Sequence, residues 1–199
     1  MQVSNVEIMG LESSIRAAKY PMAVDVYKCT DDVTPTVIAL AQSNKGEGHD
    51  QFETGIRVNF DLKCSNKMWV ELERYRFIEF ISSQSTMHRI TKLDIRKQCN
   101  SYVWSSTIDR LEGAVRVYNQ MLDLHIEPET LRKKYLEILY NVPSGFELTA
   151  RLTTNYRALK TVYAQRKLHK LPEWREFCEW IKSLPMAKEL IIQTERGAV

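Results

Sequence analysis

The segment IRVNFDLK, residues 56–63, is the strongest indication of the fold. Its apolar and polar residues alternate, which is typical of a β-strand with one buried face. The apolar set is Ile56, Val58, Phe60 and Leu62. Directly downstream, residues 66–77 interleave apolar and charged side chains at helical spacing, and Ser65 or Asn66 is in position to cap that helix. We therefore expect a strand that leads straight into a helix with one buried face.

The segment ELERYRFIEFISSQSTMHR, residues 71–89, is the candidate functional site. It gathers arginine, histidine, glutamine and hydroxyl side chains around an aromatic run. Polar groups at this density are costly to bury without partners, so the segment is either solvated or built to bind a polar, anionic ligand. Arg74 and Arg76 suit phosphate, because a guanidinium can donate two parallel hydrogen bonds to one anion. The alternative is a solvated helix face followed by a polar strand edge.

Residues 77–81 are aromatic and β-branched and run into a polar stretch. This pattern predicts an extended segment whose hydroxyl and backbone donor groups face a ligand. Residues 90–106 carry basic and aromatic side chains without a clear period, and they are predicted to form a loop over the site. The segment KGEGHD, residues 45–50, can form only a tight turn.

The remaining periodicity predicts helices with a minority of strands. Strands are expected at residues 2–9 and 146–154. Helices are expected at about residues 11–20, 35–44, 107–125, 128–140 and 155–170, and from Pro172 to about residue 184. This order indicates an α+β fold. We expect a single domain of residues 1–199, in which residues 185–199 are peripheral and form at most one further short helix.

The composition excludes several classes of protein. The 199 residues are 44% hydrophobic and 27% charged, which is ordinary for a globular chain with a sizeable core. The net charge of +3 does not mark a nucleic-acid binder but is compatible with an anionic small molecule. The four cysteines are far apart and form no CxxC pair, so no zinc site or disulfide framework is indicated. Because neither a signal peptide nor a membrane-spanning apolar run is found, we expect a cytoplasmic protein.

Several landmarks occur in the order found in the flavin-dependent thymidylate synthases, also called thymidylate synthase-complementing proteins. Gly48-His49 precedes the strong strand, and Arg74-Tyr75-Arg76 stands where that family has an Arg-His-Arg triplet. Near the C-terminus, Asn155, Arg157 and Leu159 open a helix that continues to Arg166 and His169. Residues 16–19, RAAK, are similar to the family's alanine-rich first helix. The resemblance covers about residues 2–184 and implies helices packed around a small, mostly antiparallel sheet.

The resemblance also implies an activity. The family is a homotetramer that holds FAD at subunit contacts and methylates dUMP to dTMP, with methylenetetrahydrofolate as carbon donor and NADPH as reductant. By position, the cofactor-binding residues would be His49, Arg74, Tyr75, Arg76, Arg166 and His169. The substrate-binding residues would be Glu71, Ser83, Gln84, Ser85 and Arg166. Arg166 would be the catalytic residue that polarises the uracil, and no metal is implied.

Three departures from the family's pattern bear on these roles. Tyr75 replaces the central histidine of the triplet, so the aromatic ring is kept but the titratable imidazole is lost. In the family seven residues separate the triplet from a serine, whereas here six separate Arg76 from Ser83 and eight separate it from Ser85; Leu139 stands where an arginine is expected. We expect Arg89, Arg151 or Arg157 to compensate for that lost arginine.

Three alternatives to a thymidylate synthase stay open. The same scaffold could act on another pyrimidine nucleotide. It could also have lost the flavin and become a non-catalytic nucleotide- or nucleic-acid-binding module, which the basic, aromatic stretch from Lys92 to Trp104 supports. A purely structural α+β protein is the third alternative, and it predicts that Arg74, Arg76 and Arg166 lie far from one another.

Overall fold

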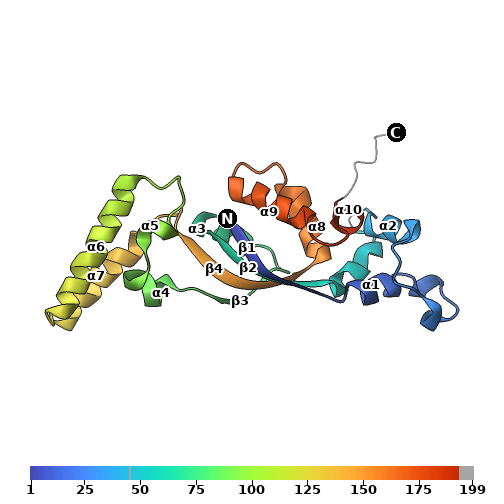
Figure 1. Ribbon diagram of the computed structural model, residues 1–199, viewed down its shortest axis with the longest axis horizontal. Coiled ribbons are helices and arrows are strands. Elements are labelled where there is room, and N and C mark those ends of the chain that lie inside the picture. The colour runs from blue at the N-terminus through green and yellow to red at the C-terminus, as the bar shows by residue number, and fades with distance from the viewer. Residues whose placement is uncertain (45, 193–199) are drawn as a thin grey trace.

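The computed structural model describes residues 1–44 and 46–192, and its centre is a four-stranded antiparallel sheet in the order β1-β2-β4-β3 (Figure 1). The strands are β1 (Gln2–Met9), β2 (Arg57–Ser65), β3 (Glu79–Ser83) and β4 (Glu147–Asn155). The two central strands pair along their whole length, from Arg57 opposite Asn155 to Ser65 opposite Glu147. The prediction of an α+β fold with a small antiparallel sheet is therefore confirmed.

The helices form two groups along the chain, and the longest, α6 and α7, belong to the second. The first group is α1 (Leu11–Ala17), η1 (Tyr20–Met22), η2 (Val26–Lys28), α2 (Pro35–Ala41), η3 (His49–Gly55) and α3 (Asn66–Leu72). The second group is α4 (Thr86–Arg89), η4 (Ile90–Lys92), α5 (Ile95–Gln98), α6 (Ser105–Asp123), α7 (Pro128–Tyr140), α8 (Tyr156–Arg166), α9 (Pro172–Lys182) and α10 (Ala187–Leu190). None of the helices in the described part of the chain combines the length and apolar composition needed to span a bilayer.

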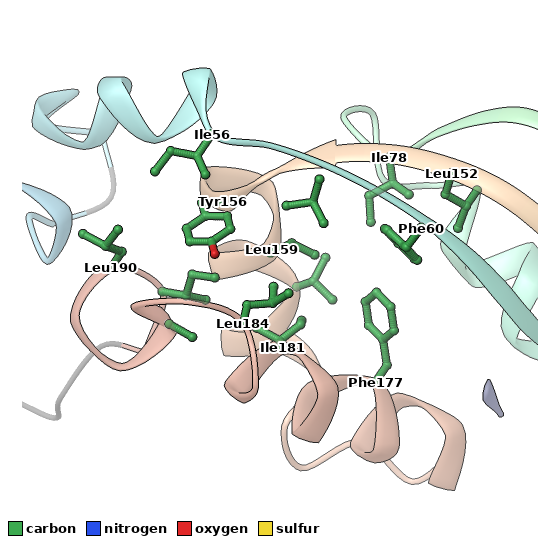
Figure 2. Close-up of a cluster of buried hydrophobic side chains, with 14 of the residues drawn as sticks. Ile56, Phe60, Ile78, Leu152, Tyr156, Leu159, Phe177, Ile181, Leu184 and Leu190 are labelled. Carbon is green, nitrogen blue, oxygen red and sulfur yellow. The ribbon is translucent and has the colours of Figure 1, made fainter. Parts of the chain in front are cut away.

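The main core lies between the sheet and α8, α9 and α10. Figure 2 shows Ile56, just before β2, and Phe60 and Leu152 on the sheet facing Leu159, Phe177 and Ile181 on the helices. Each of these side chains is buried. The Phe60 ring lies 5.9 Å from the Phe177 ring and 4.7 Å from the Trp180 ring, within the usual range of favourable aromatic pairs. The alternation of residues 56–63 thus predicts the buried face of β2 correctly.

The opposite face of the sheet carries polar residues. Figure 1 shows no helix over its middle in the described part of the chain. Arg151 of β4 lies 3.2 Å from Asp61 of β2 and 2.8 Å from Glu7 of β1. Lys63 of β2 forms a similar ion pair with Glu147 of β4, at 3.3 Å. An antiparallel sheet with one solvated face is expected to alternate in this way.

The junction between β2 and α3 is built around a buried hydroxyl. Ser65 Oγ accepts a hydrogen bond from Met68 N at 3.2 Å, so Ser65, and not Asn66, caps α3. The same hydroxyl donates to Glu173 Oε2 at 2.6 Å, and Ser65 N donates to Glu173 Oε1 at 2.8 Å. The start of α3 is therefore fixed against α9. The predicted helix of residues 66–77 ends early, at Leu72, because two successive tight turns follow it: Tyr75 N donates to Leu72 O, and Ile78 N donates to Tyr75 O.

A second core lies under the α6–α7 hairpin, at the far end of the molecule from α1 and α2 (Figure 1). Ile90 and Ile95 are buried in it together with residues of α6 and α7. The prediction that residues 90–106 form a loop over the site is wrong, because this segment contains η4 and α5 and contributes to that core. At the other end of the chain, Leu190 and Ile191 are buried in the main core, and residues 193–199 lie outside the described residues.

Candidate functional site

A pocket of about 700 Å³ opens beside the start of β2 and the first turns of α8. This volume lies in the range of small-molecule sites. The residues that line it are Ser43, Gly46, Asp50, Gln51, Thr54, Arg57, Phe77, Asn155, Arg157, Ala158, Lys160, Thr161, Ala164 and Gln165. Gly46 and Gly48 have φ angles of 100° and 79°, which glycine adopts at no steric cost. The turn that they form starts η3 and so brings Asp50 against α8.

Asp50 pairs with two of the cations that line the pocket. Its Oδ1 lies 2.9 Å from Arg157 Nε, and its Oδ2 lies 2.6 Å from Lys160 Nζ. Arg157 Nη1 also donates to Gln51 Oε1 at 2.7 Å, and Lys160 Nζ donates to the Ala41 carbonyl at 2.7 Å. Asp50 and Lys160 are both buried, so the pairing fixes η3 to α8 in a region of low dielectric.

Glu53 lies behind Lys160 and is fully buried. Its Oε2 is 2.8 Å from Lys160 Nζ in an ion-pair contact of poor hydrogen-bond geometry, and its Oε1 has no hydrogen-bond partner among the described residues. Burial raises the pKa of Glu53 from 4.5 to about 8, although Lys160 opposes the shift. Glu53 does not line the pocket, and the charged residues among the described lining, Asp50, Arg57, Arg157 and Lys160, give it a net positive charge.

A second group of side chains surrounds Arg166, at the C-terminal end of α8. Arg166 Nη1 lies 2.9 Å from Glu71 Oε2, and Arg166 Nε donates to the Tyr75 hydroxyl at 2.8 Å. Its guanidinium carbon lies 5.5 Å from the Tyr75 ring centre and 4.6 Å from that of Trp174. Trp174 Nε1 donates to Glu71 Oε2 at 2.9 Å, and His169 Nε2 lies 3.5 Å from the same oxygen. The guanidinium is thus oriented from several sides.

The Arg166 group is connected to the pocket by Gln165. The Tyr75 hydroxyl donates to Gln165 Oε1 at 2.9 Å, and Gln165 lines the pocket. Phe77, two residues after Tyr75, lines it as well. A ligand that fills the pocket therefore lies next to Gln165, which accepts a hydrogen bond from Tyr75, and Tyr75 in turn contacts Arg166.

Comparison with known proteins decides the fold. No protein-family model and no curated protein matches the chain in sequence. Thymidylate synthase X from Helicobacter pylori, solved with FAD and dUMP, superposes with a TM-score of 0.69 at 16% identity, over 96% of this chain and 97% of that one. This chain has the fold of the flavin-dependent thymidylate synthases. A second structure of the H. pylori enzyme with the same ligands matches with a TM-score of 0.67 at 16% identity, over 96% of this chain and 98% of that one.

The same fold is shared with an enzyme of different specificity. The UMP/dUMP methylase PolB from Streptomyces cacaoi, solved with 5-Br dUMP, matches with a TM-score of 0.58 at 15% identity, over 97% of this chain and 98% of that one. The resemblance to the flavin-dependent thymidylate synthases is therefore confirmed for the fold, over nearly the full length.

The thymidylate synthase-like fold brings some of the predicted residues together. Glu71, Tyr75, Arg166 and His169 meet around one guanidinium. Arg74 and Arg76 flank Tyr75 but are exposed, and neither lines the pocket. His49 is also exposed and stands next to Asp50 without being part of the lining. The purely structural alternative predicts that Arg74, Arg76 and Arg166 lie far from one another, whereas Arg166 contacts Tyr75, the residue between the other two arginines.

The predicted substrate residues Ser83, Gln84 and Ser85 lie elsewhere, in an open groove of about 330 Å³ at the end of β3. Trp69 and Glu73 of the α3 segment form the other side of this groove. The Gln84 side chain is already used within the sheet, because its Oε1 accepts from Thr149 N at 2.9 Å while Gln84 N donates to Thr149 O. Gln84 therefore extends the β3–β4 ladder by one step.

Of the three arginines proposed to compensate for Leu139, Arg157 lines the pocket, whereas Arg151 is paired on the open face of the sheet and Arg89 lines neither cavity. Sequence reasoning did not predict Asp50, Arg57 or Lys160 as part of a site. Two signals could have found them: Asp50 directly follows the Gly-His landmark, and Lys160 lies one turn after Arg157 on the landmark helix.

Proposed function

We propose that this chain is a flavin-dependent enzyme that acts on a pyrimidine nucleotide, with reductive methylation of dUMP to dTMP as its leading reaction. The observation that carries the proposal is the meeting of Glu71 and Tyr75 with Arg166 and His169, two pairs that are separated by about ninety residues in sequence. These are residues that the resemblance assigns to the ligand site. The match over nearly the full length to enzymes solved with dUMP or its bromo derivative supports the same proposal.

FAD would occupy the pocket beside α8. The pocket fits part of a dinucleotide in size, and its positive lining suits an anionic cofactor. Gln51, Asn155 and Gln165 would hold it through their amide groups. When bound, the reduced flavin supplies the hydride that completes the methyl group, with NADPH as reductant and methylenetetrahydrofolate as carbon donor.

The role of the protein is to orient and polarise. Arg166 would direct positive charge at a uracil carbonyl, and the contacts with Glu71, Tyr75 and Trp174 hold it in place before the ligand arrives. Such preorganisation lowers the cost of reorganising the site during the reaction. The groove at Ser83 and Ser85 would take the phosphate of the nucleotide through hydroxyl groups. We place the enzyme in the cytoplasm as a homotetramer with sites at its subunit contacts.

The visible absorption spectrum of the purified protein, before and after addition of FAD and desalting, tests the proposal. We expect retained flavin bands that shift when dUMP is added, followed by conversion of dUMP in the presence of methylenetetrahydrofolate and NADPH. A protein that retains no flavin and shows no spectral response would contradict the proposal and favour a non-catalytic binding module.

A second candidate is the same chemistry on another pyrimidine nucleotide. Gln84, at the position of the family's serine, is bonded to Thr149, and PolB shows that the fold also accommodates a UMP/dUMP methylase. A turnover panel of UMP, dUMP, CMP and dCMP decides between the two. Faster turnover of a nucleotide other than dUMP would replace the leading reaction by this one.

A further inference from the structure

Among the described residues, three cations line the pocket beside α8, and they differ in how far their charges are already neutralised. Arg157 and Lys160 both contact the Asp50 carboxylate, and each has a further acceptor, Gln51 Oε1 for Arg157 and the Ala41 carbonyl for Lys160. An anionic ligand that used either cation would have to compete with a partly buried carboxylate. Such competition is unfavourable, because Asp50 would lose its partners while still shielded from water.

Arg57 is the exception. It is exposed, it lines the pocket, and its side-chain contact among the described residues is a hydrogen bond of 3.3 Å from Nη2 to the neutral hydroxyl of Thr153. It is the first residue of β2, opposite Asn155, so its stem starts beside the N-terminus of α8. The positive end of the helix dipole at Asn155 adds to the attraction for an anion at this place.

An independent feature indicates that the pocket takes a polar ligand. Ser43 lines it, is only 6% exposed, and its Oγ has no hydrogen-bond partner among the described residues. Buried hydroxyl groups are nearly always paired, and an unpaired one costs free energy. A ligand with polar groups on the Ser43 side would satisfy this hydroxyl.

We propose that Arg57 binds the phosphate of the ligand in this pocket and so makes the site select phosphorylated flavins over riboflavin. The choice of a flavin rests on the function proposed above. The anion site itself rests on the charges and contacts of Arg57, Asp50, Arg157 and Lys160. A guanidinium with one weak neutral partner can turn its fork toward a phosphate without breaking an ion pair.

The test compares Arg57→Gln and Arg57→Lys with the native protein by calorimetric titration with FAD, FMN and riboflavin. We expect Arg57→Gln to weaken FAD and FMN about tenfold or more, as befits the loss of a charge-assisted hydrogen bond, and riboflavin less than about twofold. Arg57→Lys, which keeps the charge but not the fork, should fall between. Arg116→Gln, an equal change of charge at an exposed position on α6, is the control and should change none of the three affinities.

Two outcomes overturn the inference. If Arg57→Gln weakens the affinities for FMN and riboflavin equally, Arg57 has a structural role and does not bind the phosphate. If the affinity for FMN is unchanged, Arg57 is not part of the site. If the native protein binds none of the flavins, the flavin assignment fails by itself, and titration with inorganic pyrophosphate then tests the anion site separately. Pyrophosphate binding that Arg57→Gln abolishes would support the anion site without a flavin, and no binding of pyrophosphate would overturn it.

Discussion

Tyr75 shows how a substituted landmark residue can keep a positioning role. Its hydroxyl accepts a hydrogen bond from Arg166 and donates one to Gln165, while its ring packs against the same guanidinium. Tyr75→Phe keeps the ring and removes both hydrogen bonds. We expect a loss of about 1–2 kcal/mol in the free energy of unfolding and weaker flavin retention, because the connection between Arg166 and the pocket is broken.

Urea unfolding and flavin retention after desalting measure the two effects of Tyr75→Phe. Tyr118→Phe is a matched control, because the Tyr118 hydroxyl has no hydrogen-bond partner among the described residues while its ring packs on Tyr135. Equal losses in the two variants would contradict a positioning role for Tyr75.

Glu53 gives a prediction for the dependence of stability on pH. Since burial raises its pKa from 4.5 to about 8, the folded protein holds a proton between these values that the unfolded chain has lost. The free energy of unfolding should therefore fall as the pH rises from about 5 to 8, by up to about 1.4 kcal/mol per pH unit from this group. Below about pH 4.5 the contribution is fully present, and above pH 8 it is lost.

Glu53→Gln isolates the contribution of this carboxyl group. The amide has the same shape and does not titrate, so the stability of the native protein relative to the variant should decline across this pH window. Urea unfolding of both proteins at pH 5, 6, 7 and 8 measures the difference. Parallel stability curves would show that Glu53 is ionised in the folded protein at all these values.

At the scale of single residues, the sequence located the Arg166 group better than the pocket. Tyr75 and Arg166 belong to motifs with fixed local spacing, which a sequence displays directly. Asp50 and Lys160 gain their importance by pairing across two elements. No local pattern distinguishes such a pair from surface charges, so sequence reasoning passed over it.

Among the secondary-structure elements, α7 was predicted to the residue. Helix α7 runs from Pro128 to Tyr140 as expected, because proline suits the first turn of a helix and Pro143 prevents its continuation. Segments without such signals were missed. Residues 90–106 form two short helices held by Ile90 and Ile95, which are too few apolar residues to show a period.

The N-cap of α8 allows a prediction at the scale of an element. Asn155 Oδ1 accepts a hydrogen bond from Ala158 N at 2.9 Å, and Asn155 is buried between β4 and the pocket. Asn155→Ala should cost about 1–2 kcal/mol in the free energy of unfolding. The cap of α2 is the control, because Thr34 accepts a longer bond of 3.4 Å at a less buried position. Urea unfolding that shows Thr34→Ala to be the costlier change would contradict this ranking.

At the scale of the whole molecule, the predicted ligand residues fall into two places. Glu71, Tyr75 and Arg166 connect to the pocket beside α8, whereas Ser83 and Ser85 lie in the groove at the end of β3, and the two cavities share no lining residue. One site that uses both sets can be completed by a second copy of the chain. The motifs alone could not reveal this separation, because it depends on the path of β3 along the edge of the sheet.

The β3 edge itself has the character of a subunit contact. Phe77, Ile81 and Met87 are exposed by 59%, 58% and 57% along this edge strand and its flanks. Exposed apolar side chains on an edge strand favour association, and a stable monomer would need to protect them. This edge supports self-association, and under the homotetramer proposed above we expect light scattering after size-exclusion chromatography to give four times the mass of the 23.2 kDa chain.

Ile81→Lys tests whether the β3 edge makes that contact. A charge at the centre of the edge should shift the mass toward a dimer or monomer and, with it, weaken binding of dUMP, because the groove at Ser83 and Ser85 would no longer face a second copy. Leu124→Lys places the same charge at a residue 73% exposed just after α6 and should leave the mass unchanged. An Ile81→Lys variant that stays tetrameric would show that the β3 edge is not the subunit contact, and a native protein that is monomeric would place the two sets of residues in separate sites within one chain.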